Sequence, residues 1–184
     1  SDWLRAKVKA AGELCTKVDG GDGDPSITSS VYQQALEDWV HRVVEHVRER
    51  DKSHVVAYYH PGAEWDLSYD RRYTPGDDAR FRKWLLVRYG SIKRLNVEWG
   101  SQYSAFNEIE SPKHTLIDAF PKQSLCAGLT KDTPGKPWLS SNGAIRDWST
   151  YWYEAVAEYI NGTSRLFKQL DPTRPTVSYL TFAW

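Results

Sequence analysis

The sequence predicts an α/β fold in which parallel strands are joined through helices. Two short apolar runs, residues 55–59 and 176–182, are typical of strands buried in a parallel sheet. Stretches with apolar side chains at three- and four-residue steps precede and separate them. Because consecutive parallel strands are joined through helices in such folds, the order helix, strand, helices, long helix, strand indicates an α/β layer. We therefore expect the two runs to be parallel neighbours in one sheet.

Residues 2–50 begin without a clear pattern and then become helical. Residues 2–18 show no regular period, and the glycine- and aspartate-rich residues 19–25 predict a loop. A helix is predicted from a cap at Ser29 or Ser30 to about residue 50. Its apolar positions are Val31, Ala35, Leu36, Trp39, Val40, Val43, Val44 and Val47.

Between the two apolar runs, the sequence predicts three helices and a long irregular connection. Pro61 and Gly62 end the first run. Pro75-Gly76-Asp77-Asp78 start a helix that runs over residues 79–89 and closes at Gly90, and a short helix over residues 92–99 follows. The first of these helices should bury Phe81, Trp84, Leu85 and Val87. Residues 101–141 contain four prolines and no clear element, which is typical of a functional connection or a lid.

A long helix is predicted over about residues 145–170. Gly162 could interrupt it, and Asp171-Pro172 end it. Its apolar stripe consists of Trp148, Trp152, Val156, Tyr159, Ile160 and Leu166.

Charge and motifs exclude several classes of function. The chain has 24 basic and 24 acidic side chains, which argues against a nucleic-acid partner. No run of 18 or more apolar residues predicts a membrane span. Phosphate-loop, dinucleotide, zinc-protease and serine-elbow motifs are absent from the sequence, so we expect no cofactor. His41 and His46 lie on a polar helix face, and the aspartates of residues 19–24 lack the calcium-loop spacing, so we expect no metal site.

The cysteines and aromatic residues allow two interpretations each. Cys15 and Cys126 are interpreted as separate small buried side chains, because two cysteines are not a disulfide framework; a single bridge is the alternative. The 9 Trp, 11 Tyr and 5 Phe suit a carbohydrate-binding protein, whose aromatic rings stack on sugars. The same residues also fill hydrophobic cores, and composition alone favours that interpretation. The Asn161-Gly162-Thr163 glycosylation pattern falls inside a predicted helix and is interpreted as coincidence.

Glu64 is the first candidate for chemistry. It follows the end of the first predicted strand, in a loop. Trp65, Tyr58 and Tyr59 beside it would exclude water and raise the pKa of its carboxyl group, as a general acid requires. The alternative is a solvent-exposed loop glutamate without a catalytic role.

Several short motifs follow Glu64 in a particular order. They are Phe81-Arg82-Lys83-Trp84-Leu85, Tyr89-Gly90, Leu95-Asn96-x-x-Trp99-Gly100, Phe106-x-x-Ile109-x-x-Pro112 and Asp147-Trp148. Over roughly residues 30–180 this pattern resembles the middle of a retaining β-galactosidase of glycoside hydrolase family 42. The resemblance implies part of a (β/α)8 barrel with parallel strands and flanking helices. Because such a barrel typically takes about 250 residues, residues 1–184 would form a single partial domain.

The resemblance also implies a function and a set of site residues. Glu64 would be the acid/base of a glycoside hydrolase that acts on β-linked sugars. From their positions beside Glu64, His60, Trp65, Asp66 and Tyr69 are candidates to bind the carbohydrate substrate. His60 could instead shift the pKa of Glu64, or be a packed or capping histidine. Further chain segments or subunits would complete the barrel. Trp99 is interpreted as a packing wedge under the active-site loops.

Two departures from the family pattern keep a second function open. Ala63 stands where most members have an asparagine before the acid/base, so Pro61-Gly62-Ala63-Glu64 is more similar to the turn of β-amylase-type barrels. No residue matches the second catalytic glutamate, which would follow a later strand. The alternative is therefore a non-catalytic carbohydrate-binding or structural remnant of a barrel; a small unrelated α/β domain is a third interpretation.

Overall fold

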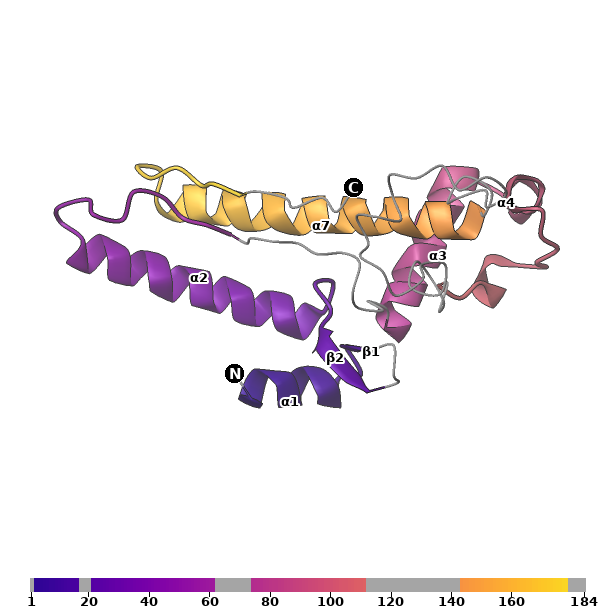
Figure 1. The fold of residues 1–184 in the computed structure, drawn as a ribbon, viewed down its shortest axis with the longest axis horizontal. Helices are drawn as coiled ribbons and strands as arrows, with labels where there is room; N and C mark the ends of the chain where they lie inside the picture. Colours follow the sequence, from indigo (N-terminus) through magenta and orange to yellow (C-terminus); the bar gives the residue numbers. More distant parts are fainter. Residues whose placement is uncertain (1, 17–20, 62–73, 112–142, 179–184) are drawn as a thin grey trace, which may run out of the picture.

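The computed structural model describes residues 2–16, 21–61, 74–111 and 143–178, and most of them are helical (Figure 1). The elements in chain order are α1 (Asp2–Ala10), β1 (Leu14–Thr16), β2 (Asp22–Pro25), α2 (Ser30–Arg50), α3 (Pro75–Tyr89), α4 (Ile92–Trp99), the 3₁₀ turn η1 (Phe106–Glu108) and α7 (Gly143–Leu170). None of these helices combines the length and the apolar character that crossing a bilayer requires.

Two long helices, α2 and α7, form the frame of the molecule. They lie side by side and run in the same direction, and the chain after each of them turns back along the pair (Figure 1). The two returning segments are hydrogen-bonded in parallel at Tyr59 and Thr176. The Tyr59 amide donates to the carbonyl of Pro175 (3.0 Å), and the Val177 amide donates to the carbonyl of Tyr59 (2.9 Å). The two runs are parallel neighbours at this bridge, as expected, but neither of them forms a strand in the described part, and residues 179–182 lie outside it.

The first apolar run is less buried than the sequence predicts. Val55 is 82% exposed and Tyr58 is 50% exposed, whereas Tyr59 is buried. Val55 lies four residues before Tyr59, and in an extended segment side chains four residues apart point to the same face. Within the part of the chain that the structure describes, the helices cover this face at Tyr59 but not at Val55. The expectation of burial on both faces is wrong for this chain on its own.

Apolar side chains from helices and returning segments form two clusters. In the smaller cluster, Tyr59 stacks on Phe167 of α7 at 4.7 Å between ring centroids, next to Val40 and Val44 of α2. The larger cluster joins α3 and α4 to the first half of α7 and includes Phe81, Leu85, Leu95, Ile109, Trp148, Tyr151, Trp152 and Val156. The aromatic residues of the described part therefore largely serve the core, as the composition favoured.

The helix boundaries follow from local capping. The Ser29 hydroxyl accepts a hydrogen bond from the Tyr32 amide and so begins α2. Thr74 caps α3 in the same way, and α3 begins at Pro75, in the Pro75–Asp78 stretch that was predicted to start it. Helix α7 begins at Gly143 and continues through Gly162 without interruption. The burial stripe of α7 is confirmed, but Trp39 of α2 and Val87 of α3 are exposed rather than inward.

The N-terminal 25 residues form a unit that the sequence pattern did not predict. Helix α1 packs on an antiparallel pair of short strands, β1 and β2. Gly23 is required there, because a Cβ atom at this position would lie 2.8 Å from the carbonyl oxygen of Cys15. Cys15 is buried, as expected, whereas Cys126 lies outside the described residues. Asp22 and Asp24 lie in β2 rather than in the predicted loop; they stay exposed and pair with Lys9 and Arg5 of α1.

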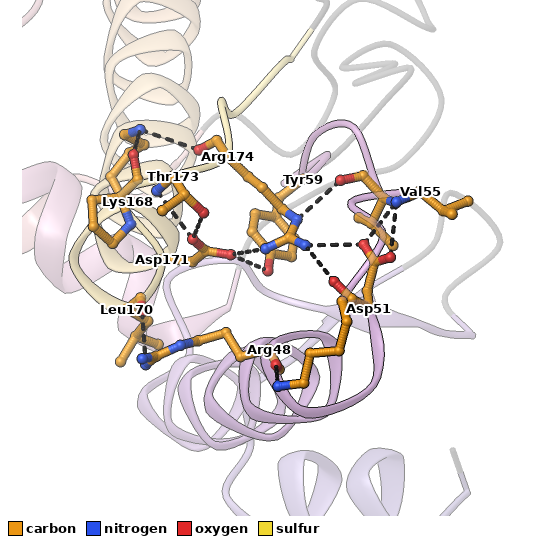
Figure 2. A network of polar contacts seen from close by, with 12 residues as sticks. Arg48, Asp51, Val55, Tyr59, Lys168, Leu170, Asp171, Thr173 and Arg174 are labelled. Carbon is orange, nitrogen blue, oxygen red and sulfur yellow. Dashed lines mark hydrogen bonds and ion pairs between the residues drawn. The ribbon is translucent and has the colours of Figure 1, made fainter.

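A polar network fixes the starts of the two parallel segments (Figure 2). The buried Arg174 guanidinium donates to the carboxylate of Asp171 (2.7 Å) and to that of Asp51 (2.9 Å). Its Nε donates to the carbonyl of Val56 (3.0 Å). Asp51 in turn accepts the amides of Val55 (2.8 Å) and Val56 (2.9 Å). One cation thus joins the end of α2, the end of α7 and the segment that follows α2.

The same network shifts the acidity of its carboxyl groups. Burial alone would raise the pKa of Asp171, but hydrogen bonds from Thr173, Arg174 and Tyr59 outweigh it and hold the pKa well below its ordinary value. The amides of Val55 and Val56 lower the pKa of Asp51 in the same direction. Burial, together with the bond to Asp171, raises the pKa of the Tyr59 hydroxyl to about 12.

Asp171→Asn should lower the free energy of unfolding at neutral pH. It should also make that free energy fall less steeply as the pH decreases. A carboxyl group whose folded pKa is depressed stabilises the fold above its unfolded pKa of about 4, and this contribution is lost as the pH falls through the folded value. The measurement is the free energy of unfolding in urea from pH 7 down to about pH 2 for both proteins. A variant with the wild-type slope below pH 4 would contradict the role assigned to Asp171.

Candidate functional site

The predicted site residues follow directly on the paired segment. His60 is half-buried and Pro61 is buried, and together they end the described part of this segment. Both returning segments run toward the half of the frame where α2 and α7 begin (Figure 1). Glu64, Trp65, Asp66 and Tyr69 lie outside the described residues.

Tyr59 does not have the role that was expected for it beside Glu64. Its ring is buried among α2 and α7 side chains, and its hydroxyl donates to Asp171 at 2.9 Å. Because neighbouring residues point to opposite faces, Tyr58 and His60 lie on the face opposite Tyr59. Of the two described residues expected to shield the carboxyl group, Tyr58 is half exposed and Tyr59 is buried in the core, and Trp65 lies outside the described residues.

Thr74 and Asp77 fix the other end of the connection that carries Glu64. The Thr74 hydroxyl accepts the Asp77 amide (3.1 Å) and donates to the Asp77 carboxylate (2.8 Å). The same carboxylate accepts hydroxyl bonds from Ser26 (3.1 Å) and Thr28. Asp77 is fully buried, and burial raises its pKa, against the opposing effect of these hydroxyl bonds. The end of this connection is thereby tied to the turn between β2 and α2.

The next residue of α3, Asp78, fixes the start of residues 112–142. Its carboxylate accepts the Ser111 amide at 2.9 Å and also the Ser111 hydroxyl. Ser111 is buried, and Arg82 on the next turn of α3 donates to the carbonyl of Ile109. Both long connections therefore meet the first two turns of α3.

The Leu-Asn-x-x-Trp-Gly motif has a structural role at the end of α4. Leu95 is fully buried. The Asn96 side chain donates to the carbonyl of Tyr103 (2.8 Å) and accepts the amide of Tyr103 (3.0 Å) and the hydroxyl of Ser101 (2.8 Å). Gly100 ends α4 in the left-handed conformation, with φ 64°, which favours glycine. The motif thus shapes residues 100–105.

Trp99 of this motif reaches a buried carboxylate on α7. Its indole N–H donates to Asp147 at 2.9 Å, and the Tyr89 hydroxyl donates to the same oxygen at 2.5 Å. The guanidinium groups of Arg88 and Arg146 lie 3.6 and 3.7 Å from the other Asp147 oxygen. These contacts explain why Tyr89-Gly90, Trp99-Gly100 and Asp147-Trp148 occur together in one chain. Packing at Trp99, which the sequence favoured over sugar stacking, is what the structure shows.

The described part of the chain shows no metal centre. It contains no group of three or more side chains that could hold a metal ion. A groove of about 1250 Å³ lies between α2, α3 and α7, with charged side chains of both signs along it. Arg80, Lys83, Glu154 and Glu158 are among its lining residues.

Sequence reasoning missed the two fully buried aspartates, Asp77 and Asp147. Both were visible only as parts of motifs: Asp77 in the start of a helix, and Asp147 beside Trp148. The spacing Thr74-x-x-Asp77 is a capping pattern that could have identified the first one. Nothing local indicates the partners of Asp147, which lie 48 and 58 residues away.

Comparison with known proteins places this arrangement in a fold class. The crystal structure of the β-galactosidase from Bacillus circulans sp. alkalophilus superposes with a TM-score of 0.68 at 18% identity, over 98% of this chain and 25% of that one. The chain is part of a (β/α)8 barrel of this kind. The predicted fold class is confirmed at this level, although the described part itself is mostly helical.

The sequence comparison identifies the family. The family model for the β-galactosidases of glycoside hydrolase family 42 matches residues 6–182, and the chain belongs to this family. The β-galactosidase Bga of Halorubrum lacusprofundi is 36% identical over 91 residues, which are 46% of this chain and 13% of the relative. The β-amylase of Niallia circulans is 30% identical over 121 residues, 62% of this chain and 18% of the relative. The chain thus spans less than a fifth of the length of these relatives.

Trp99→Phe should destabilise the fold more than Trp84→Phe. Both indoles donate to a carboxylate, Trp99 to the buried Asp147 and Trp84 to the exposed Glu154 (2.6 Å). Removing a hydrogen bond to a buried charge costs about 2 kcal/mol, and an exposed one costs less than about 0.5 kcal/mol. Urea denaturation of both variants measures the difference. Equal losses would show that the bond between Trp99 and Asp147 does not hold α4 to α7.

Proposed function

We propose that residues 1–184 form a partial barrel domain of a longer glycoside hydrolase that acts on β-linked sugars, as β-galactosidases do. The observation that carries the proposal is the family match over residues 6–182. The parallel pairing at Tyr59 supports it, because in such barrels catalytic side chains follow the carboxyl ends of the strands. Glu64 stands three residues after Pro61, at such an end.

In this proposal Glu64 is the acid/base of a retaining reaction. Its carboxyl group donates a proton to the leaving oxygen while a second carboxylate attacks the sugar carbon and forms a glycosyl–enzyme intermediate. Glu64, now ionised, then removes a proton from the water that releases the sugar. The second carboxylate belongs to another part of the longer protein and should lie about 5 to 5.5 Å from Glu64.

The remaining candidate residues would contact the sugar. Trp65 and Tyr69 offer aromatic rings for stacking, and His60 and Asp66 offer hydrogen-bonding groups for hydroxyls. No cofactor enters this reaction. The partners of the chain are a carbohydrate substrate and the segments or subunits that complete the barrel, with no nucleic acid or membrane.

A second candidate is a non-catalytic carbohydrate-binding or structural remnant of such a barrel. Ala63 favours it, because the asparagine that binds the sugar in most family members is replaced. The likeness to a β-amylase favours a different explanation of Ala63, namely that the protein acts on a substrate of the β-amylase kind. Assays of the longer protein on β-galactosides and on β-amylase substrates separate three outcomes: activity on the first, activity on the second, and no activity on either.

The isolated 184-residue chain should self-associate. Val55 and Val177 are exposed on the paired segments, which in a complete barrel would have further strands beside them. Replacing both valines by lysine should reduce the association measured by sedimentation velocity. Val87→Lys, at an equally exposed valine of α3, is the matched control and should have little effect. A monodisperse wild-type monomer that melts in one cooperative transition would contradict the proposed partial domain.

Glu64→Gln in the longer protein should affect substrates according to their leaving groups. Turnover of a substrate with a poor leaving group should fall by about 10² to 10⁴, because its departure needs the proton. An activated aryl leaving group departs without protonation, so its release should change little. Steady-state kinetics on the two substrates measure the ratio. An equal loss on both would exclude the acid role, and no loss on either would make Glu64 an ordinary loop residue.

A further inference from the structure

We propose that the groove between α2, α3 and α7 is a second binding site of this chain, and that its ligand is a short neutral saccharide. The groove has a volume of about 1250 Å³. It is larger than most small-molecule sites, which measure roughly 300 to 1,000 Å³. None of its described lining residues is a candidate for the proposed hydrolysis, so the site goes beyond the proposed function.

Gly162 keeps one wall of the groove open. It lies inside α7, lines the groove, and has no described atom within 4 Å of the position that a Cβ atom would take. Glycine is the poorest helix former after proline. Neither a positive φ angle nor a close approach of another element requires it here. The absence of a side chain at Gly162 therefore leaves room for a ligand instead of serving the helix.

The polar lining of the groove is balanced in charge. Glu154, Glu158 and Gly162 follow one another at four-residue steps and therefore share one face of α7. A surface with both charges in equal number favours neither a phosphate nor a polycation. Sugar hydroxyls both donate and accept hydrogen bonds, so they can pair with acids and bases alike. The charged lining side chains are three acids, Glu37, Glu154 and Glu158, and three bases, Arg80, Lys83 and Arg165.

The apolar lining suits the C–H faces of sugar rings without an aromatic platform. Trp84 already donates to Glu154 at 2.6 Å, and the guanidinium of Arg88 lies 4.9 Å from its ring centroid, so we assign it no stacking role. Ala155 and Ala157 line the groove together with Gly162. These small residues leave a shallow apolar surface between the charged groups.

Tyr151 provides a hydrogen-bonding group that the described part of the chain does not use. The residue is 6% exposed and lines the groove, and its buried hydroxyl has no hydrogen-bond partner among the described residues. Leaving such a group unpaired is costly. Burial raises the pKa of this hydroxyl, so it stays a protonated donor, and the charges of Arg80 and Glu158 act on it. In the proposed complex, a sugar hydroxyl displaces the exposed Arg80 side chain and supplies the missing partner.

The test measures the binding of a thio-linked β-galactotetraose to the longer protein by titration calorimetry. Saturating galactose occupies the site of the proposed hydrolysis, and the sulfur linkages resist cleavage. Gly162→Leu should weaken binding by about tenfold or more, because its side chain fills space beside Glu158. Tyr151→Phe should weaken it by about 2- to 10-fold, since one hydrogen bond is lost. Ala6→Leu adds the same side chain at an exposed position of α1; it is the matched control and should leave the affinity unchanged.

The outcomes separate the groove site from the proposed function. Leucine is a better helix former than glycine, and the Tyr151 hydroxyl has no described partner, so neither variant should lower the melting temperature. An unchanged affinity in Gly162→Leu, or no binding in the presence of galactose, would overturn the site. Tighter binding of inorganic phosphate or of a sulfated tetrasaccharide would overturn the ligand class.

Binding does not require turnover, so the groove site can stand when Glu64→Gln shows no acid effect, and it can fail when that effect is found. Should Gly162→Leu fail to fold, Tyr151→Phe decides alone.

Discussion

The Arg174 guanidinium is the contact on which the arrangement of the frame depends. It binds the last turn of α7 through Asp171, the end of α2 through Asp51, and the following segment through the carbonyl of Val56. Parallel pairing at Tyr59 supplies only two backbone hydrogen bonds in the described part, so the direction and register of the two segments need this fixed base. Tyr59 adds to this attachment, because its ring packs in the core and its hydroxyl donates a hydrogen bond to Asp171.

The two ends of the frame use different polar chemistry. Where the paired segments begin, carboxylates meet a planar cation that has several donors in fixed geometry, which suits rigid attachment. Near the start of α3, the buried carboxylate of Asp77 meets hydroxyl groups. Hydroxyls rotate and carry no charge, so such a contact holds its partners without a strong ion pair. This division agrees with the general pattern of barrels, in which the strand starts provide stability and the strand ends provide function.

Local patterns predicted the helices and the parallel pairing well, because capping serines, C-terminal glycines and apolar stripes are properties of neighbouring residues. Helix α7 begins slightly earlier than predicted, at Gly143. The exposure of Val55, Trp39 and Val87 could not be predicted, since it depends on which face meets other elements. The α1–β1–β2 unit was missed because its elements are too short to show a period. The partners of Asp77 and Asp147 lie far away in sequence, and the candidate residues from Glu64 to Tyr69 remain predictions.

Gly143 has a consequence for how this scaffold can vary. A Cβ atom there would lie 2.5 Å from Cδ1 of Trp99, so the chain can return to α7 at this point only without a side chain. Ser111 holds the other end of the same connection on α3. Between two such fixed points, doubling the length of a flexible connection costs only about 0.6 kcal/mol of closure entropy. A change in the number of residues between 111 and 143 would therefore leave both attachments in place, so this part of the sequence can vary in length, or be redesigned, while the described helices keep their packing.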